Sequence, residues 1–424
     1  MNKHLPHDLK QMQSLPLEAK IVMTQQRIKV WFESWVKYTI FNSKTKKTRF
    51  VTHTEEPNEN GCFIKRKKKV NGENVEVDEL VKGTKLKPTE YIEAAEDGQV
   101  YVAFSGGKDS TVLADLTARF CKRYGYALYL LFVNTGLEYP EIQKFVKTFA
   151  EWLRNTYEIE VHLEILRPEM RFDEVIKKYG YPAISKEISE VIYSVRNSKP
   201  GKTKTVRAKR LNGEWLDNNG NKSQFNCENW KFMLDAPFEV ANHCCSVMKK
   251  SPSAKYSSQT GRKQIVATMA HESRLRYQKW IQNGCNAFNS KKPTSQPMSF
   301  WTEQDVLHYI KKFSIPYCSV YGDIHVKPYA DAEEGQINVI DYLGCYEPED
   351  VLETTGCDRT GCIFCMFGCH LEKEPNRFQR LKETHPRQYE YCIGGGEMVD
   401  GKWQPNKEGL GLGKVLDYIG VKYD

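Results

Sequence analysis

The stretch that most constrains this chain is residues 100–110, Val-Tyr-Val-Ala-Phe-Ser-Gly-Gly-Lys-Asp-Ser. An apolar run ends in two glycines, a lysine, an acid and a serine, and a helical pattern begins at Thr111. This order predicts a strand, a tight turn and a helix N-terminus, where backbone N–H groups and the helix dipole act on one anion. The sequence therefore predicts a phosphate site directly after a strand, formed by Ser105, Gly106, Gly107, Lys108, Asp109 and Ser110.

Two residues of this loop carry charge. Lys108 adds a positive charge beside the predicted anion. Asp109 is a poor phosphate ligand by itself, but it can hold a Mg²⁺ that bridges phosphate oxygens. The loop differs from the Gly-x-x-x-x-Gly-Lys-[Ser/Thr] pattern, which does not occur in the chain. The alternative is an ordinary Gly-Gly turn before a helix.

The segments after the loop alternate between strand and helix patterns. Residues 127–133 and 161–166 read as strands, and residues 111–124 and 141–155 read as helices. This β-α-β-α-β order predicts an α/β fold with a doubly wound, mainly parallel sheet and its ligand at the carboxyl ends of the strands. Upstream, we expect a helix over residues 16–42 with Trp31 and Trp35 in the core. A small basic β-hairpin between residues 42 and 87 and a short helix over residues 88–97 should follow.

The residues of the loop carry a family resemblance. Residues 105–110 resemble the SGGxDS motif of the PP-loop ATP pyrophosphatases. This resemblance implies that ATP is cleaved between its α and β phosphates, that the loop holds pyrophosphate, and that AMP passes to a substrate. Residues 132–141 resemble the Asp-Thr-Gly…Pro-Glu-Thr stretch of the phosphoadenylyl-sulfate (PAPS) reductase branch, which implies a nucleotide contact at Gly136. An acid commonly stands where this chain has Asn134, so Asn134 is not expected to bind metal.

A third segment extends the resemblance to about residue 370. Glu272, Ser273 and Arg276 match the Gly-x-Arg-x-x-Glu-Ser-x-x-Arg element of the reductase branch, although the initial Gly-x-Arg is missing. Arg276, together with Arg274, is expected to bind ATP or substrate anions bidentately. The alternative is a surface helix start with a Glu-Arg pair. Further on, we expect Thr302 to cap a helix with Asp305 at its third position and Trp301 to lie in the core.

The cysteines predict a metal site. In a cytoplasmic chain, 13 cysteines are more often ligands or thiols than disulfides. The pattern Cys-Cys…Cys-x-x-Cys binds a [4Fe–4S] cluster in adenylyl-sulfate reductases, and this chain has a similar pattern at Cys244, Cys245, Cys362 and Cys365. That family places a basic residue beside the cluster, and Lys249 or Lys250 stands near this position. One alternative is a zinc or cluster site made of Cys357, Cys362, Cys365 and Cys369. Another is buried thiols without metal. The other seven are expected to be free thiols: Cys62, Cys121, Cys227, Cys285, Cys318, Cys345 and Cys392.

The charge distribution leaves a nucleic-acid partner open. Residues 65–69 are all basic, and residues 196–210 hold seven basic residues and no acid. Such segments suit a phosphate backbone, and equally a solvated strand edge or loop. The net charge of +8 permits a polyanionic partner without requiring one. With no apolar run of about 20 residues and no signal-peptide core at the start, we expect a cytoplasmic protein with no membrane association.

These observations lead to one functional prediction with two alternatives. We expect three regions: residues 1–99 with an N-terminal helix and the basic insertion, a PP-loop domain over 100–345 with a basic insertion near 186–225, and a Cys-rich region over 346–424. The chain lacks the Glu-Cys-Gly-[Ile/Leu]-His motif of sulfonucleotide reductases and retains the full ATP-type loop.

The resemblance therefore implies an adenylating enzyme for sulfur transfer, with ATP, Mg²⁺ and a [4Fe–4S] cluster. A sulfur donor or reductant protein would be its partner. In its combination of motifs, the chain most resembles the PP-loop subunit of DNA phosphorothioation systems. The alternatives are a divergent sulfonucleotide reductase, and a non-catalytic nucleic-acid-binding protein with structural zinc.

Overall fold

The computed structural model describes residues 4–5, 7–54, 63–70, 73–80, 86–198, 206–290, 292–327 and 350–424. Of residues 63–70 and 73–80 it describes the backbone only. The chain divides into two compact units, each built from separate stretches of sequence. The first contains Met1–Phe132, Pro140–Ile165 and Lys255–Thr360, and the second contains Val133–Tyr139, Leu166–Ala254 and Gly361–Asp424.

The first unit is built on a six-stranded sheet with the order β10-β11-β9-β6-β7-β8. Its strands are β6 (Val100–Ala103), β7 (Leu128–Val133), β8 (Val161–Leu166), β9 (Lys263–Ile265), β10 (Asn286–Ala287) and β11 (Thr294–Ser295). β6 pairs in parallel with both β7 and β9, β9 pairs in parallel with β11, and the edge strand β10 pairs antiparallel with β11. The predicted α/β fold with a mainly parallel, doubly wound sheet is therefore confirmed.

The strand order fixes where a ligand should bind. The chain runs outward from β6 through β7 to β8 and then returns to place β9 on the other side of β6. The connection therefore reverses direction between β6 and β9. In open parallel sheets, a crevice forms at such a reversal outside the carboxyl ends of the strands. The loop after β6 lies at this point of the sheet.

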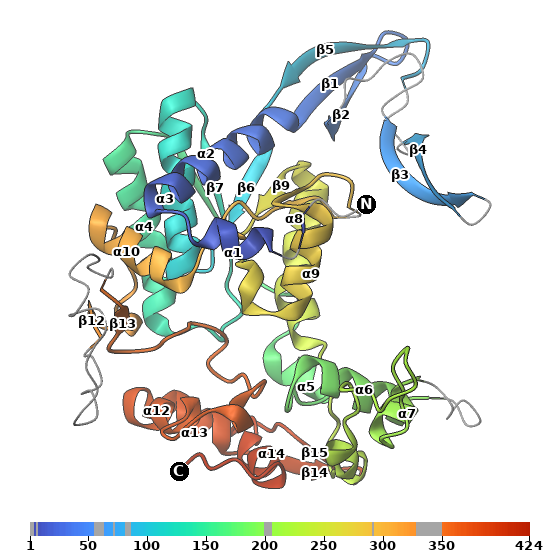
Figure 1. The fold of residues 1–424 in the computed structure, drawn as a ribbon, viewed down its shortest axis with the longest axis vertical. Coiled ribbons are helices and arrows are strands. Elements are labelled where there is room, and N and C mark those ends of the chain that lie inside the picture. Colours follow the sequence, from blue (N-terminus) through green and yellow to red (C-terminus); the bar gives the residue numbers. More distant parts are fainter. Residues whose placement is uncertain are drawn as a thin grey trace. The chain divides into compact units, whose positions relative to one another are not determined.

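Helices complete the first unit (Figure 1). They are α1 (Asp8–Gln13), α2 (Leu17–Ser34), α3 (Lys108–Tyr124), α4 (Pro140–Tyr157), α8 (Ser251–Thr260), α9 (Arg274–Asn283) and α10 (Glu303–Phe313), with short turns at Ala270–Glu272 and Ser319–Tyr321. Thr302 caps α10 in the predicted box with Asp305, because Thr302 N–H donates to Asp305 Oδ2 at 2.6 Å and Asp305 N–H donates to Thr302 Oγ1 at 3.2 Å. Trp301 is fully buried, as expected.

A buried carboxylate joins three of these helices. Asp115 in the middle of α3 is fully buried. It accepts hydrogen bonds from Tyr157 at the end of α4 (2.5 Å) and from Tyr309 in α10 (2.6 Å). Arg119, one turn along α3, donates to it at 2.8 Å. Three donors thus compensate the cost of removing this charge from water.

Two predicted elements before β6 were wrong. The expected helix over residues 16–42 stops at Ser34, and β1 (Val36–Asn42) follows. Residues 90–96 form the strand β5 (Glu90–Glu96) in place of a helix, because they pair antiparallel with β1. Together with β2 (Lys47–His53) these strands make a separate sheet in the order β2-β1-β5. Trp31 and Trp35 are buried, as predicted.

The predicted basic hairpin exists as backbone. β3 (Phe63–Val70) pairs antiparallel with β4 (Glu73–Leu80), and β3 contains the basic residues 65–69. The side chains of these two strands lie outside the described part of the structure. A short antiparallel pair, β12 (Ile324–Val326) and β13 (Leu352–Thr354), also belongs to the first unit.

The second unit is mainly helical. Its helices are α5 (Phe172–Tyr179), α6 (Lys186–Arg196), α7 (Val206–Leu211), α12 (Arg377–Thr384), α13 (Pro386–Ile393) and α14 (Leu412–Tyr418), with one hairpin, β14 (Glu397–Val399) and β15 (Lys402–Gln404). Short helical turns lie at Glu228–Asp235, Ser246–Lys250 and Cys369–Leu371. The charged stretch over residues 372–391 contains two helices, because Pro386 begins a new helix after His385.

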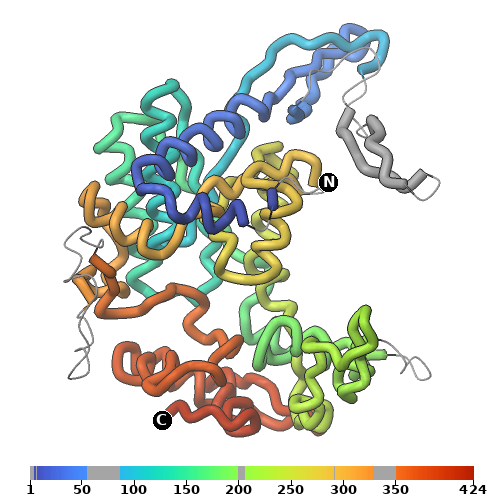
Figure 2. The backbone as a smooth tube through the Cα atoms, viewed as in Figure 1, coloured from blue at the N-terminus to red at the C-terminus, as the bar shows by residue number. Residues whose placement is uncertain are grey.

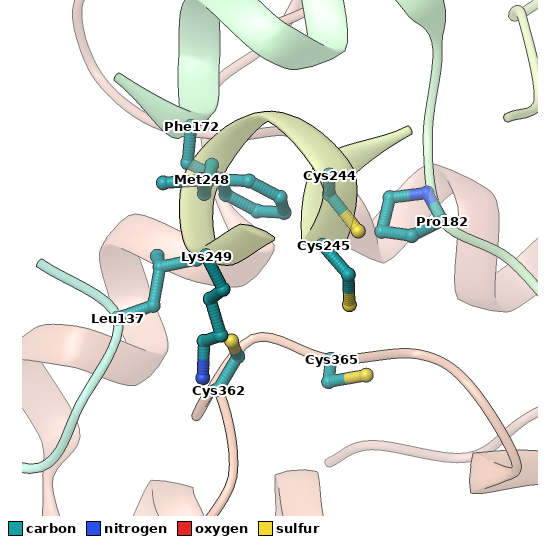
Figure 3. Close-up of a pocket in the computed structure, with 9 residues that line it drawn as sticks. All are labelled: Leu137, Phe172, Pro182, Cys244, Cys245, Met248, Lys249, Cys362 and Cys365. Carbon is teal, nitrogen blue, oxygen red and sulfur yellow. The ribbon is translucent and has the colours of Figure 1, made fainter. Parts of the chain in front are cut away.

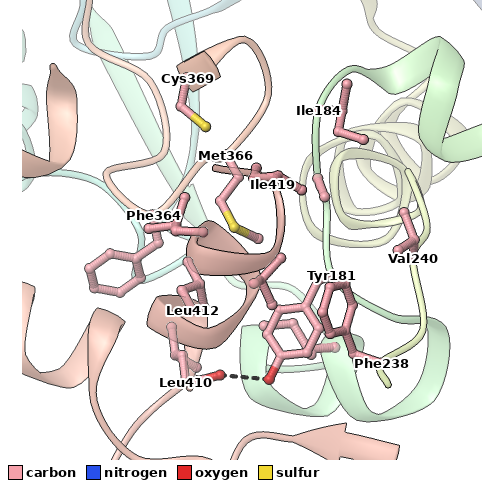
Figure 4. Close-up of a cluster of buried hydrophobic side chains, with 14 of the residues drawn as sticks. Tyr181, Ile184, Phe238, Val240, Phe364, Met366, Cys369, Leu410, Leu412 and Ile419 are labelled. Carbon is pink, nitrogen blue, oxygen red and sulfur yellow. Dashed lines mark hydrogen bonds between the residues drawn. The ribbon is translucent and has the colours of Figure 1, made fainter. Parts of the chain in front are cut away.

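The second unit contains two long stretches of the chain, residues 166–254 and 361–424, whose colours in Figure 2 set them apart. Side chains from both stretches form one hydrophobic core (Figure 4). Tyr181, Phe238 and Val240 come from the first stretch, and Leu412 and Ile419 come from the second. The hydroxyl of the buried Tyr181 donates to the backbone carbonyl of Leu410 at 2.8 Å. The glycine-rich C-terminal residues are thus part of this core.

None of the helices in the described part of the chain is both long enough and apolar enough to cross a membrane.

Candidate functional site

The loop after β6 depends on its two glycines. Gly106 has a φ of +75°, and a Cβ on it would lie 2.9 Å from Ile142 Cγ2 of α4. A Cβ on Gly107 would lie 2.8 Å from Thr360 Oγ1. Gly106 therefore allows the left-handed turn and the approach to α4, and Gly107 keeps the backbone open toward the neighbouring segment. The predicted helix is present, but α3 begins at Lys108, three residues before the expected start at Thr111.

Two serines hold the loop in shape. Ser110 Oγ lies 2.8 Å from the carbonyl oxygen of Gly107 and 3.2 Å from the N–H of Ser105. The hydroxyls of Ser105 and Ser110 are 3.1 Å apart. The side chain of Ser105 also lies 3.4 Å from the N–H of Gly107. These contacts fold the loop back on the first turn of α3, which leaves the N-terminus of α3 facing a cavity.

The cavity at this loop encloses about 710 Å³ of empty space, part of it open to solvent. Its walls come from the loop after β6, from residues 266–268 after β9, and from segments that return later in the chain. The size lies in the range typical of small-molecule sites. Its position between β6 and β9 is where the strand order predicts ligand binding. The lining residues are Ala103, Ser105, Gly107, Lys108, Asp109, Ser110, Val266, Ala267, Thr268, Glu272, Tyr321, Arg359 and Thr360.

Lys108 is buried and surrounded by oxygen atoms. Its Nζ donates to the carbonyl oxygen of Asp358 at 2.8 Å and lies 2.9 Å from Glu303 Oε1. Asp109 Oδ1 is 3.9 Å away. Burial opposes the charged ammonium, but the carboxylates of Asp109 and Glu303 outweigh it and raise the pKa of Lys108. Lys108 therefore stays positively charged. In this structure its ammonium group contacts carboxylates, and it can contact phosphate oxygens in their place.

Asp109 has one oxygen without a hydrogen-bond partner. Its Oδ1 is buried, and among the described residues no donor reaches it within hydrogen-bond distance. Burial raises the pKa of Asp109, Lys108 lowers it, and the carboxylates of Glu272 and Glu303 raise it further. A buried carboxylate oxygen without a donor, on the wall of a cavity, is a suitable ligand for a hard cation such as Mg²⁺. The residues present therefore fit the Mg²⁺ predicted from the sequence.

Three residues of the cavity wall were missed by sequence reasoning. The hydroxyl of Tyr321 accepts from the N–H of Lys108 at 3.0 Å, and it lies 2.8 Å from Thr360 Oγ1. The Tyr321 hydroxyl thus accepts a hydrogen bond from one of the backbone N–H groups at the N-terminus of α3. Arg359 also lines the cavity, and its Nη1 lies 3.8 Å from Glu272 Oε1. The sequence Asp-Arg-Thr-Gly directly before Cys362 was the available signal, because it places a cation and a hydroxyl beside two cysteines.

The other three residues predicted to contact the nucleotide are not among the residues that line the cavity. Arg276 is absent from the cavity lining, but it pairs with Glu272, which belongs to it. Arg274 is exposed at the start of α9 and is also absent from the lining. Gly136 belongs to the second unit, has a φ of +76°, and its N–H donates to Asn134 Oδ1 at 3.0 Å. Nucleotide contacts by these three residues stay predictions.

The second unit contains a pocket lined by the four predicted cysteine ligands (Figure 3). Cys244 and Cys245 lie on one helical turn, and Cys362 and Cys365 lie on the loop that faces it. Apolar side chains form most of the remaining wall, and Lys249 is the charged side chain among the described lining residues. The other lining residues are Leu137, Phe172, Pro182 and Met248.

The lysines and thiols around this pocket shift one another's pKa values. The hydrogen bond from Cys244 lowers the pKa of Cys245, against the effect of burial, and Lys186, Lys249 and Lys250 lower it further. Burial raises the pKa of Cys362 to about 11, although Lys249 opposes this shift. Burial lowers the pKa of Lys249, but Cys362 and Glu138 outweigh it and raise the value to about 12. The Lys249 ammonium lies 3.6 Å from Glu138 Oε1.

The donor set fits a thiolate-bound metal centre in its chemistry, because four thiols share one mostly apolar pocket with a cation beside them. The thiols do not converge at coordination distance. Within the described ranges, no group of three or more His, Cys, Asp or Glu side chains is arranged to hold a metal ion. A cluster or zinc ion at Cys244, Cys245, Cys362 and Cys365 therefore stays a prediction.

The two other cysteines of the alternative ligand set, Cys357 and Cys369, are not among the residues that line this pocket. Cys357 belongs to the first unit, whereas Cys362, Cys365 and Cys369 belong to the second. Cys369 is 2% exposed and packs in the hydrophobic core (Figure 4). Of the cysteines expected to be free thiols, Cys121, Cys227, Cys285, Cys318 and Cys392 form no disulfide. Cys62 and Cys345 lie outside the described residues.

The basic segment 196–210 is partly neutralised within the second unit. Arg196 is mostly buried, and its guanidinium donates to the backbone carbonyls of Met233, Leu234, Ala236 and Phe238. Arg207 pairs with Glu190, and Arg210 pairs with Glu187. Residues 199–205 lie outside the described residues. The Arg196 guanidinium therefore binds the protein's own backbone.

Comparison with known families matches residues 99–366 to the phosphoadenosine phosphosulfate reductase domain. The match covers more than half of the chain, which therefore belongs to the phosphoadenosine phosphosulfate reductase family. This family uses nucleotides, in agreement with the cavity at the β6 loop. Comparison with curated proteins gave no significant match.

Among solved structures, the chain matches the NMN synthetase from Francisella tularensis with 14% identity and a TM-score of 0.24. The aligned region covers 51% of this chain and 62% of that chain, so the match spans less than two thirds of the length of the synthetase.

Proposed function

We propose that this protein cleaves ATP between the α and β phosphates and transfers AMP to a substrate, as a step toward sulfur transfer. The observation that carries the proposal is the cavity at the β6 loop. It combines the helix N-terminus, a buried cation at Lys108, a second cation at Arg359 and a carboxylate oxygen of Asp109 without a donor. Such a set matches the needs of a triphosphate with a bound Mg²⁺.

The chain's residues support an in-line displacement. The nucleophilic oxygen or nitrogen of the substrate forms a bond to the α-phosphorus and loses its proton to solvent. The bond from this phosphorus to the bridging oxygen breaks, and pyrophosphate leaves with the electron pair. Lys108 exchanges its contacts with Glu303 and the Asp358 carbonyl for pyrophosphate oxygens, and backbone N–H groups at the start of α3 stabilise the same charge.

Two residues complete the leaving-group site. Asp109 would hold Mg²⁺, which supplies charge neutralisation on the phosphate oxygens. Arg359 lines the cavity beside Glu272, and a guanidinium in this place can bind a phosphate bidentately once it leaves that carboxylate. The Tyr321 hydroxyl has to release the Lys108 N–H before a phosphate oxygen can accept from it.

The second chemical step concerns sulfur. A donor protein or small molecule with sulfur at the sulfide level would form a bond to the activated atom of the substrate, and AMP would leave with the electron pair of the broken bond. Cys244, Cys245, Cys362 and Cys365 would hold a [4Fe–4S] cluster, which supplies a binding site for sulfur or organises the pocket. Lys249 beside Cys362 would balance part of the negative charge of the thiolates.

The two alternatives are less well supported. A sulfonucleotide reductase needs an accessible nucleophilic thiol, but Cys392 and Cys369 are buried, and burial raises the pKa of both. A non-catalytic protein with structural zinc would leave the retained Lys108 and Asp109 without a task. Its support from the segment 196–210 weakens, because Arg196, Arg207 and Arg210 have partners within the protein.

Substitution at the loop tests the proposal. We expect Asp109→Asn and Lys108→Gln each to lower the rate of ATP consumption at least about 100-fold, a loss typical of removing a charge that acts in the transition state. The matched controls are Asp173→Asn and Lys178→Gln on α5 in the second unit, which should retain the rate. Circular dichroism checks that each variant folds. If both loop variants retained the control rate, the assignment of the cavity would be wrong.

A further inference from the structure

The N-terminal sheet β2-β1-β5 has one buried face and one exposed face. Tyr38 and Ile40 of β1 and Val51 of β2 form a small core on one face. Side chains alternate between faces along a strand, so the neighbouring residues point away from this core. In β1 these are Lys37, Thr39 and Phe41, which the register places next to β2 and β5.

Aromatic rings gather on the face opposite the core. Phe50 of β2 is 62% exposed and Tyr91 of β5 is 50% exposed. Phe41 lies directly opposite Tyr91 in the register, with ring centroids 5.5 Å apart. Exposed aromatic side chains on adjacent strands are costly to leave in water, so they commonly mark a binding surface. We call Phe41, Phe50 and Tyr91 the aromatic face.

Cations accompany these rings. Lys37 Nζ lies 4.6 Å from the centroid of the Phe50 ring, and Lys46 Nζ lies 6.0 Å from that of Phe41. Residues 36–54 contain five basic residues and no acid. β5 contains three acids: Glu90, which pairs with Arg49, and Glu93 and Glu96, which lie beyond Tyr91. The aromatic face therefore combines flat apolar rings with positive charge.

We propose that the aromatic face binds single-stranded nucleic acid. Unpaired bases stack on aromatic rings, and lysines at the ring edges bind the phosphates between them. A three-stranded sheet with rings on adjacent strands can take successive bases of one strand. A duplex keeps its bases stacked and offers mainly phosphates, so it cannot use Phe41, Phe50 and Tyr91 in this way. The surface precedes residue 99, and it therefore lies outside the segment that matches the reductase family.

This surface is distinct from the basic segments recognised in the sequence. Residues 196–210 carry more charge, but Arg196, Arg207 and Arg210 of that segment bind other groups of the protein. The aromatic face has lysines next to exposed rings, which is the combination that single-strand binding requires. Positive charge without rings would favour duplex and single strand alike.

Binding of labelled oligonucleotides to the full chain tests the proposal. The probes are a 20-nucleotide oligothymidylate, an oligouridylate of equal length and a duplex of equal length, followed by fluorescence anisotropy over a range of salt concentrations. We expect at least one single strand to bind more tightly than the duplex, and the DNA and RNA arms identify which sugar is preferred. We expect Phe50→Ala and Tyr91→Ala each to weaken single-strand binding about fivefold or more.

Further variants separate stacking from folding and from charge. Phe50→Trp and Tyr91→Phe retain a ring and should retain the affinity, which a purely structural role would not require. Lys37→Gln should weaken binding and reduce the slope of log affinity against log salt by about 0.7. The controls are Val22→Ala, an equally exposed apolar residue on α2, and Lys373→Gln, an exposed lysine of the second unit. Both should retain affinity.

Three results would overturn the proposal. One is single-strand affinity that Phe50→Ala and Tyr91→Ala leave unchanged. Another is duplex binding as tight as single-strand binding, which would indicate a site that reads phosphate alone. The third is the absence of binding to all three probes at low salt, which is the result expected if the surface binds a protein or peptide. Because Asp109→Asn tests the ATP site and leaves the aromatic face intact, failure of either proposal can be recognised separately.

Discussion

At the scale of single residues, Arg359 is the main addition of the structure to the candidate site. It lies on the cavity wall, its side chain is 70% exposed, and its nearest described acidic partner is Glu272 at 3.8 Å. An exposed guanidinium contributes little to folding, because water solvates it well in the absence of ligand. Its position beside Lys108 and Asp109 instead suits binding of a triphosphate.

We predict that Arg359→Gln weakens ATP binding by about 10- to 100-fold, as expected for loss of a charge-assisted contact. Thermal unfolding should remain within about 1 °C of the unmodified protein, because a surface change of this kind alters stability very little. Isothermal titration with a non-hydrolysable ATP analogue measures the first effect. Arg171→Gln on the second unit, also an exposed arginine paired with an acid, is the control. An affinity equal to that of this control would contradict a phosphate contact by Arg359.

Local sequence predicted the loop residues well but not their partners. The glycines, Lys108, Asp109 and the cap at Thr302 follow from short patterns, because each acts within a few residues of its neighbours. Arg359, Thr360 and Tyr321 reach the cavity only after the chain returns from a distant part of the sequence. Their contribution depends on tertiary packing, which single-sequence patterns do not encode.

At the scale of elements, the buried carboxylate of Asp115 connects α3 to α4 and α10. Tyr309 and Tyr157 donate to it, and its position lies one to two turns below the loop in α3. We predict that Tyr309→Phe lowers the free energy of unfolding of the first unit by about 1.5–3 kcal/mol, because a buried charge loses a donor. Chemical denaturation measures the change. A loss no larger than that of Tyr124→Phe, at an exposed tyrosine at the end of α3, would show that the network is dispensable.

The sheet β2-β1-β5 should respond to acid through one ion pair. Arg49 of β2 binds Glu90 of β5 through two hydrogen bonds of 2.8 and 3.2 Å. The hydrogen bonds from Arg49 lower the pKa of Glu90 to about 2, against the effect of burial, and the N–H of Lys87 contributes. The pKa in the folded chain is therefore below the ordinary value of 4.5, so this pair stabilises the sheet above pH 4.5 and loses its effect as the pH falls toward 2.

We predict that the difference in melting temperature between the unmodified protein and Glu90→Gln is largest above about pH 5 and shrinks below it. Circular dichroism at several pH values measures this difference. Glu151→Gln, at an exposed position of α4, supplies the control. A difference that stayed constant from pH 7 to pH 3 would contradict the role of the Arg49–Glu90 pair.

Elements of the central sheet were predictable from sequence, whereas those of the N-terminal sheet were not. The strands β7 and β8 are short apolar runs between amphipathic helices, which is the pattern of a parallel sheet. In β5, acids alternate irregularly with Tyr91, Ile92 and two alanines, so no period distinguishes helix from strand. Pairing with β1 decides the outcome, and the register shift between Thr39 and Ile40 accommodates it.

At the scale of the whole molecule, the cysteine pairs join stretches that lie far apart in the sequence. Cys244 and Cys245 precede Cys362 and Cys365 by more than a hundred residues, yet all four line one pocket of the second unit. The sequence predicted this grouping through a resemblance. Spacing alone left Cys357 and Cys369 as competitors for the same ligand.

We predict that protein purified without oxygen contains about four iron atoms and four sulfides per chain. Cys244→Ser and Cys362→Ser should each remove most of both. Cys357→Ser, in the first unit, should retain them and thus serves as the control. Iron and acid-labile sulfide analysis with the visible spectrum makes the measurement. One zinc ion per chain and no sulfide, or loss of metal in Cys357→Ser, would contradict the proposed ligand set.

The product of ATP cleavage tests the central claim most directly. The protein is incubated with Mg²⁺ and ATP labelled in the adenine ring, and the nucleotides are separated by anion exchange while pyrophosphate and phosphate are measured in parallel. We predict AMP or an adenylated product together with an equal amount of pyrophosphate, and loss of both in Asp109→Asn. ADP with inorganic phosphate, or the same products from Asp109→Asn as from the unmodified protein, would contradict cleavage between the α and β phosphates at this loop.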